Sequence, residues 1–263
     1  MPPDGRDRGW RVHGVSAVGY RHLREGTGCQ DAHGMLRTRE GLVLAVADGA
    51  GSAPHSASGS RWAVELALEA FAPVATDWAR LPDPRERKAR LTDSFGEVRE
   101  RFLERCGGAP APYETTLTVV VVADGWLGHL SVGDGLVVVR TTGSAGPAHH
   151  LLPRPPARSE YANETVFLGS PSALAQSRAD CVRDAGVDGV LLSTDGMTNA
   201  LLKHSPAGPP LPHDAFVGHL FQRLGRDGYE QDDEDRHLRE FLASDQISKV
   251  TGDDKTLLWA IRT

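Results

Sequence analysis

Three aspartates that lie far apart in the sequence each stand beside an apolar segment. Asp48 directly follows the apolar residues 42–47, and Asp195 ends a second segment of this kind. Asp253 comes just before a third apolar segment, residues 256–261. Carboxylate oxygens held at strand ends are the ligands that Mg²⁺ and Mn²⁺ prefer. The spacing therefore predicts a site for hard divalent cations.

Two of these aspartates precede a glycine, which accepts backbone conformations that other residues do not. Gly49 and Gly196 let the chain turn sharply and can expose a carbonyl oxygen as a further ligand. An isolated Asp-Gly pair is more often a turn, and Asp124-Gly125 lies between alternating apolar segments as hairpin turns do. Asp48 and Asp195 instead lead into helical patterns, which favours the ligand interpretation.

Strands and helices alternate along the chain and must position these aspartates. The continuous apolar run at 42–47 predicts a strand that is buried on both faces. Apolar residues recur at helical spacing over residues 62–71 and 91–102. Two Asp-Gly pairs divide residues 116–141 into what we expect to be an antiparallel meander. Helical segments separated by strand-rich ones predict stacked sheets with helices outside.

Composition narrows the class of protein. The 263 residues suffice for a single domain over residues 10–263, behind an expected disordered lead-in over residues 1–9. The net charge of −6 gives no basic surface for nucleic acid. Three widely spaced cysteines suit a reducing compartment and form no zinc pattern. No apolar stretch approaches the ~20 residues of a membrane span, so we expect a cytoplasmic protein.

Six short motifs lie in order along most of the chain, from Val15 to Ile261. They are Gln30-Asp31-Ala32, Val46-Ala47-Asp48-Gly49-Ala50-Gly51, Thr115-Thr116-Leu117, Ser131-Val132-Gly133-Asp134-Gly135, Ser193-Thr194-Asp195-Gly196 and Asp253-Asp254-Lys255-Thr256-Leu257. Each motif is weak alone, but their order is specific. Together they resemble the metal-dependent serine/threonine protein phosphatases of the 2C type, in their bacterial form.

This resemblance implies a fold, a reaction and a set of site residues. The fold would be a central antiparallel β-sandwich with helices on both sides, in four layers. The reaction would be hydrolysis of phosphoserine and phosphothreonine in proteins by a water that bridges two Mn²⁺ or Mg²⁺ ions. The implied catalytic residues are Asp31, Asp48, Asp195 and Asp253, with Asp31 holding metal-bound water. The implied metal ligands are Asp48, Gly49, Asp195 and Asp253, with Asp134 serving a third, weaker ion.

The sequence departs from the family pattern in the residues that would contact substrate. The family usually has an arginine five positions before Asp31 that grips the phosphate, and Gly26 occupies that position here. Arg21, His22 and Arg24 lie nearby at a different spacing, so the gripping residue stays open. Asp254 stands where asparagine is usual.

A histidine of the animal members has no counterpart in this chain. It follows their bridging Asp-Gly, and Ala50 stands near that place here. His55 is expected to be an ordinary loop residue rather than an acid catalyst.

Two other classes of function stay open. A phosphatase-like fold with weak catalysis could serve as a sensing or scaffolding module, which the missing arginine favours and the full carboxylate set disfavours. A nucleotide-binding α/β enzyme is the other alternative, because Gly49-Ala50-Gly51 follows a strand and precedes a helix. Pro54 replaces the third glycine of that fingerprint, and no GxxxxGK motif occurs.

The resemblance also implies which binding partners the chain would have. The partner would be a phosphorylated protein that is the target of a serine/threonine kinase, and the chain would act as a monomer without nucleic acid or membrane. Residues 142–163 are expected to form a long Pro-rich loop near the site that influences the choice of protein substrate. Of the two meander turns, only Asp134 is expected to face the metals, and Asp124 is not.

Overall fold

The structure is a computed structural model that describes residues 9–81, 83–123, 125–153, 165–183, 186–205 and 208–263. Its strands are β1 (Trp10–Ala17), β2 (Ala32–Arg37), β3 (Gly41–Ala47), β4 (Leu117–Ala123), β5 (Trp126–Val132), β6 (Leu136–Gly143), β7 (Gly146–Leu151), β8 (Arg178–Arg183), β9 (Val187–Ser193), β10 (Leu202–Ser205), β11 (Gly208–Pro212) and β12 (Lys255–Arg262). Its α-helices are α1 (Tyr20–Glu25), α2 (Ser56–Asp77), α3 (Pro84–Arg105), α4 (Ala173–Gln176), α5 (Thr198–Leu201), α6 (Asp214–Gly225), α7 (Gln231–Ala243) and α8 (Asp245–Ser248).

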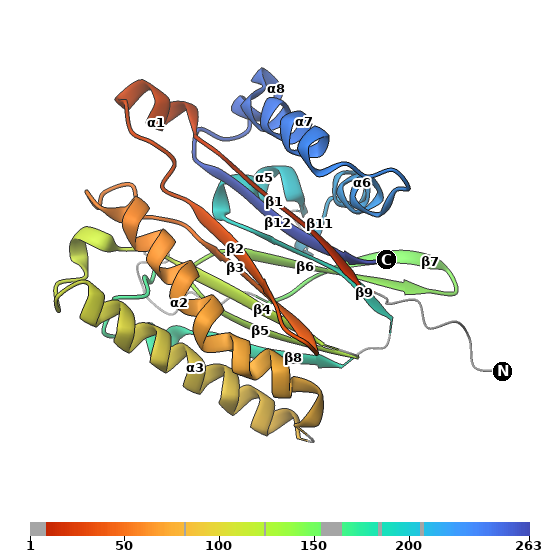
Figure 1. Ribbon diagram of the computed structural model, residues 1–263. Coiled ribbons are helices and arrows are strands. Elements are labelled where there is room, and N and C mark those ends of the chain that lie inside the picture. The colour runs from red at the N-terminus through yellow and green to blue at the C-terminus, as the bar shows by residue number, and fades with distance from the viewer. Residues whose placement is uncertain (1–8, 82, 124, 154–164, 184–185, 206–207) are drawn as a thin grey trace.

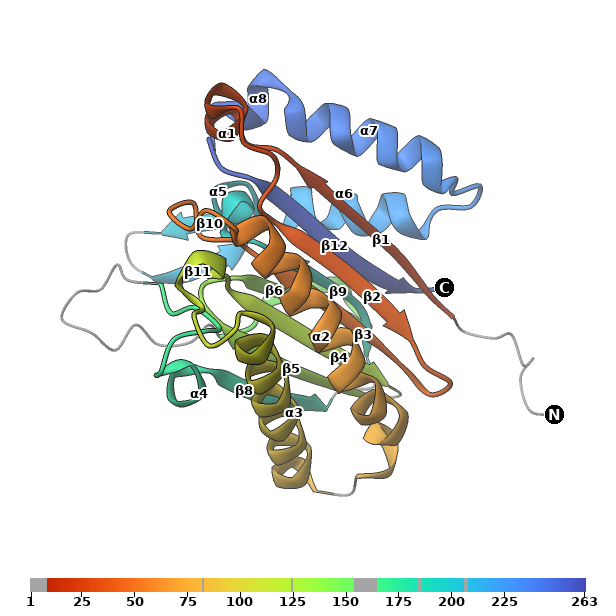
Figure 2. The same cartoon turned by 60° about the vertical axis from the view of Figure 1, so that its left-hand side comes forward.

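Two five-stranded antiparallel sheets lie one above the other (Figures 1 and 2). The first has the strand order β2-β3-β4-β5-β8 and the second the order β1-β12-β9-β6-β7. Helices α2 and α3 cover the outer face of the first sheet, and α6 and α7 cover the outer face of the second. The four-layer α+β fold expected from the sequence is therefore confirmed.

The apolar run before Asp48 is buried on both faces because β3 lies inside this stack. Val43 and Ala45 pack in the core beneath α2 and α3. Leu44 and Val46 point the other way, into the core between the two sheets. Alternate residues of a strand face opposite sides, so a strand with helices on one side and a sheet on the other must be apolar throughout.

Strand β12 repeats this arrangement in the second sheet. Leu258 and Ala260 face the core between the sheets, whereas Trp259 faces α6. The indole Nε1 of Trp259 is buried and donates a hydrogen bond of 3.2 Å to the carbonyl of Leu220 in α6. A buried indole needs such a partner, and this one ties the outer helix to the sheet.

The expected meander over residues 116–141 is only half right. Strands β4 and β5 pair as a hairpin, but β6 pairs with β7 and β9 in the other sheet. The chain therefore crosses between the sheets at residues 133–135, and Gly133 has a φ of +94° that favours glycine there. Local turn chemistry does not distinguish a hairpin from such a crossing.

Two segments for which the sequence predicts no helix or strand contain regular structure. Helix α1 lies within residues 20–34, and it buries none of its six residues, so it shows no helical period of apolar positions. Strand β7 lies within residues 142–163 on the sheet edge, and its largely exposed residues give no apolar alternation. Residues 154–163 of that second segment lie outside the described residues, as do residues 1–8 of the expected lead-in.

Another pairing was not expected from the sequence: β10 and β11 form a short two-stranded sheet. The helical pattern expected after Asp195 is a 3₁₀ turn, Asp195–Met197, followed by α5. Proline-rich β11 and four-residue β10 are too short and irregular to give a strand signal.

Among the described residues, no helix is long and apolar enough to cross a membrane.

Candidate active site

A pocket of about 210 Å³ lies at one end of the sandwich. Because the strands are antiparallel, the C-terminal ends of β3, β5 and β9 meet the N-terminal ends of β4 and β12 there. The lining residues are Arg21, His22, Asp48, Gly49, Ala50, Gly51, Thr116, Asp134, Thr165, Phe167, Asp195 and Asp253. All five expected metal ligands therefore come together, although they lie up to about two hundred residues apart in the sequence.

The threonine pair before β4 holds Asp48 in place through its backbone. The Asp48 N–H donates to the hydroxyl of Thr116 at 3.0 Å, and its carbonyl accepts from the hydroxyl of Thr115 at 2.9 Å. The Thr116 N–H also donates to the Asp48 carbonyl, at 2.8 Å. These bonds satisfy the backbone of Asp48 and leave its carboxylate free to face the pocket.

The backbone at Gly196 packs closely against the backbone of Asp254, and this contact brings Asp195 near Asp253. A Cβ added at Gly196 would lie 1.8 Å from the carbonyl oxygen of Asp254, so only glycine fits there. The hydroxyl of Ser193 also donates to the carbonyl of Thr256 at 2.8 Å, which joins the end of β9 to the start of β12. The glycine of this Asp-Gly motif therefore allows the end of β9 to pack against the start of β12, in addition to allowing a turn.

Burial and repulsion between neighbouring carboxylates disfavour the ionised forms of the aspartates in the pocket. Burial raises the pKa of Asp48 well above its ordinary value, and the nearby charges of Asp31, Asp195 and Asp134 raise it further. Burial also raises the pKa of Asp195, with Asp134 and Asp253 adding to the effect. A group of carboxylates that repel one another in this way is stabilised by a cation.

The donor set of the pocket fits hard divalent cations. The carboxylates of Asp48, Asp134, Asp195 and Asp253 supply oxygen only, which suits Mg²⁺ or Mn²⁺ and disfavours zinc. Within the part of the chain that the structure describes, no three His, Cys, Asp or Glu side chains already converge closely enough to hold a metal.

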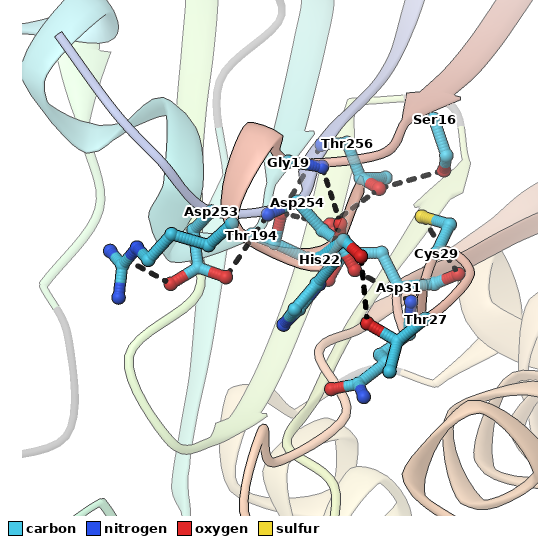
Figure 3. Close-up of polar contacts among 12 residues, drawn as sticks. Ser16, Gly19, His22, Thr27, Cys29, Asp31, Thr194, Asp253, Asp254 and Thr256 are labelled. Carbon is cyan, nitrogen blue, oxygen red and sulfur yellow. Dashed lines mark hydrogen bonds and ion pairs between the residues drawn. The ribbon is translucent and has the colours of Figure 1, made fainter. Parts of the chain in front are cut away.

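Asp31 is not among the residues that line the pocket, and its carboxylate lies beside Thr194 and Thr256 (Figure 3). Its side chain is buried, and Oδ2 accepts hydrogen bonds from Thr194 at 2.7 Å and from Thr256 at 2.8 Å. Its other oxygen, Oδ1, is buried and has no hydrogen-bond partner. Burial raises the pKa of Asp31 to about 7 despite these two bonds. A buried carboxylate oxygen without a donor is a place where a water or another donor is needed.

Comparison with known proteins identifies the family. A profile described as protein phosphatase 2C matches residues 18–243. The chain belongs to this family. Serine/threonine-protein phosphatase 3 of Escherichia coli strain K12 is 31% identical over 267 residues, covering 95% of this chain and 99% of that protein.

Solved structures agree with the fold. Serine/threonine phosphatase Stp1 from Staphylococcus aureus superimposes with a TM-score of 0.65 at 14% identity, covering 100% of both chains. A bacterial serine phosphatase gives a TM-score of 0.66 at 15% identity, covering 97% of this chain and 98% of that one.

Asp254, which departs from the family's usual asparagine, is nearly fully buried beside the pocket. Its Oδ1 accepts from the Gly19 N–H at 2.7 Å and its Oδ2 from the Gln30 N–H at 2.6 Å. It therefore joins the segment around α1 and the segment before Asp31 to the start of β12 (Figure 3).

Gly26, which stands where the family usually has the phosphate-binding arginine, lies at the C-terminal end of helix α1. Gly26 is the C-cap of α1 with a φ of +72°, a left-handed conformation that strains any other residue. The short helix that ends there places Arg21 and His22 in the lining of the pocket instead. The sequence raised these two residues only as neighbours at the wrong spacing, because a six-residue helix with no buried face leaves no periodic signal.

Asp134 lies in the pocket because of the crossing between sheets. The loop at residues 133–135 follows β5 and precedes β6, so it lies at the end of the sandwich where both sheets contribute. A Cβ at Gly135 would lie 2.4 Å from the hydroxyl of Thr118, which keeps the loop close to β4. Asp124, its expected counterpart without a metal role, lies outside the described residues.

Proposed function

We propose that this chain hydrolyses phosphoserine and phosphothreonine in proteins with the help of two Mn²⁺ or Mg²⁺ ions. The observation that carries the proposal is the single pocket that gathers four carboxylates from distant strand ends. Membership of the protein phosphatase 2C family and the relative named serine/threonine-protein phosphatase 3 support the same reaction.

The chain's own oxygen atoms would hold the ions. Asp48 would bridge the two ions, with the carbonyl of Gly49 and the carboxylates of Asp195 and Asp253 completing the set, and Asp134 would serve a third, weaker ion. When bound, the ions lower the pKa of a water and stabilise negative charge on the phosphoryl oxygens. We assign Asp31 to orient a water through Oδ1, because this atom is buried and lacks a donor.

We predict that the protein hydrolyses phosphothreonine peptides only when Mn²⁺ or Mg²⁺ is present. Phosphate release would be measured with purified protein, with added metal and after chelation. Hydrolysis should stop in the chelator and return when metal is added in excess. Full activity of a metal-free sample would contradict the proposed mechanism. No hydrolysis with either metal would favour the alternative, a catalytically weak module that senses or scaffolds.

We propose that Arg21 contacts the substrate phosphate. It is the arginine among the described lining residues, and its guanidinium lies 3.7 Å from the Asp253 carboxylate with 60% of the side chain exposed. Because a loosely held, exposed arginine can turn toward an incoming phosphate, it is suited to bidentate phosphate binding.

We expect Arg21→Ala to raise KM for a phosphothreonine peptide about tenfold or more, because a hydrogen bond to a charged group contributes about 1.5–3 kcal/mol. Arg24→Ala is the matched control, since Arg24 is exposed on the same helix and lies outside the pocket lining. Steady-state kinetics of both variants would test this. Equal effects would show that α1 acts only through its overall charge.

The proposal also includes the kind of substrate, the oligomeric state and the cellular compartment. The substrate would be a protein phosphorylated by a serine/threonine kinase, and the chain would act on it as a monomer in the cytoplasm. Arg154 and Arg158, from the segment expected to influence substrate choice, lie outside the described residues.

A further inference from the structure

His22 reaches the pocket from α1. Its imidazole lines the pocket, and 12% of the side chain is exposed. Nδ1 lies 2.9 Å from Oδ1 of Asp254, a side chain that is itself only 3% exposed. Asp254, which stands where the family usually has asparagine, therefore contacts a histidine that lines the pocket.

Backbone contacts fix where this imidazole lies. The Gly19 N–H is bound by Asp254, and the Arg21 N–H donates to the carbonyl of Gly252 at 3.2 Å. A Cβ at Gly19 would lie 2.4 Å from the backbone of Asp253, so α1 begins in direct contact with the turn before β12. Helix α1 is short, but this contact holds it in place (Figure 3).

The far side of the imidazole faces the loop that follows Asp48. A Cβ at Gly51 would lie 3.9 Å from Nε2 of His22, an ordinary van der Waals distance. The small residues Ala50 and Gly51 therefore leave room for a ring that arrives from α1. With Asp254 on the Nδ1 side, Nε2 is the nitrogen nearest to Gly51, which also lines the pocket.

We propose that His22 is the proton donor to the leaving oxygen of the substrate and that Asp254 is its positioning residue. This inference rests on the proposed phosphatase activity. When the P–O ester bond breaks, its electron pair stays on the serine or threonine oxygen, and that oxygen takes the proton from Nε2. A water oxygen forms the new bond to phosphorus and releases a proton to solvent, and solvent returns a proton to Nε2.

The pairing with Asp254 explains why a buried carboxylate is useful at this position. Nδ1 of His22 is buried and lies at hydrogen-bonding distance from Asp254, but it is not aligned as a hydrogen bond. A small rotation of the ring aligns the two groups, and catalytic hydrogen bonds commonly tighten only when substrate is bound. A carboxylate there fixes the orientation of the ring and with it the position of Nε2.

A substrate series with different leaving groups tests the proposal. An alkoxide from phosphothreonine needs a proton when it leaves, whereas the nitrophenolate from p-nitrophenyl phosphate does not. We expect His22→Gln to lower kcat on a phosphothreonine peptide about 10²-fold, the ordinary contribution of a general acid, and to change kcat on p-nitrophenyl phosphate by less than about threefold. KM for the peptide should stay within about twofold, because the proton is transferred only in the transition state.

Two further variants sharpen the test. Asp254→Asn keeps an oxygen that can accept from Gly19 or Gln30 but removes the charge beside Nδ1, so it should give the same substrate pattern with a smaller loss. His55→Gln is the matched control: the His55 ring packs on Tyr113 at 5.3 Å between centroids and does not line the pocket. It should leave both substrates unaffected.

The outcomes separate the inference from the function on which it rests. If the wild-type protein hydrolyses neither substrate with Mn²⁺ or Mg²⁺, the proposed function fails. If the wild-type protein is active and His22→Gln loses equally on both substrates, or on neither, His22 is not the proton donor. Thermal unfolding of each variant shows whether a loss reflects folding, and a misfolded His22→Gln protein would leave the decision to the substrate pattern of Asp254→Asn.

Discussion

Asp48→Asn should lower hydrolysis of a phosphothreonine peptide by about 10³-fold or more, a barrier change of about 4 kcal/mol. Asparagine keeps the shape of the side chain but removes the charge that would bridge two cations. The backbone bonds to Thr115 and Thr116 do not involve the carboxylate and should survive. A variant that kept more than about a tenth of the rate would limit the role of Asp48 to less than ~1.4 kcal/mol.

Stability measurements distinguish a metal ligand from a folding residue at this position. Because burial and neighbouring charges raise the pKa of Asp48, its ionisation opposes folding of the metal-free protein as pH rises. Asp48→Asn should therefore melt at or above the wild-type temperature in chelator. The rise in melting temperature on adding Mn²⁺ should shrink, because at a given metal concentration a more weakly bound ligand stabilises the folded state less. Asp93→Asn, an exposed change on α3, is the control for both measurements.

Gly196→Ala should damage both the fold and the site. Its Cβ would lie 1.8 Å from the carbonyl oxygen and 3.0 Å from the carbonyl carbon of Asp254, and neither backbone atom can rotate away. We expect a loss of about 2–3 kcal/mol in the free energy of unfolding, as for overpacked sites, and a fall of roughly 4–12 °C in melting temperature. Moving the end of β9 away from β12 also separates Asp195 from Asp253, so kcat should fall at least tenfold.

Gly143→Ala is the matched control for this strand-end glycine. A Cβ there meets no atom within 4 Å, and the residue ends β6 away from the pocket. Melting and kinetics of the two variants, measured with saturating metal, should differ clearly. Similar behaviour would mean that the turn before β12 can yield without cost, and that the Asp-Gly motif at residues 195–196 is only a turn.

The amino-acid sequence by itself determined the layers and most of the carboxylate set. A strand such as β3 must be apolar on both faces when it lies between a helix layer and a sheet, so its burial could be predicted from the run alone. Asp48 and Asp195 were recognisable because each ends such a strand before a glycine. These signals are local, since a few neighbouring residues carry the whole pattern.

Only the tertiary structure decided which polar residues meet. Asp134 comes to the pocket through a crossing between sheets that resembles a hairpin turn in sequence. His22 and Arg21 come from a helix with no buried residue, held by Gly19 and Gly252 against the turn before β12. The contact of His22 with Asp254 joins residues separated by more than two hundred positions. Such contacts depend on backbone surfaces that fit within van der Waals distance, and this fit is a property of the folded chain that no short pattern of residue types contains.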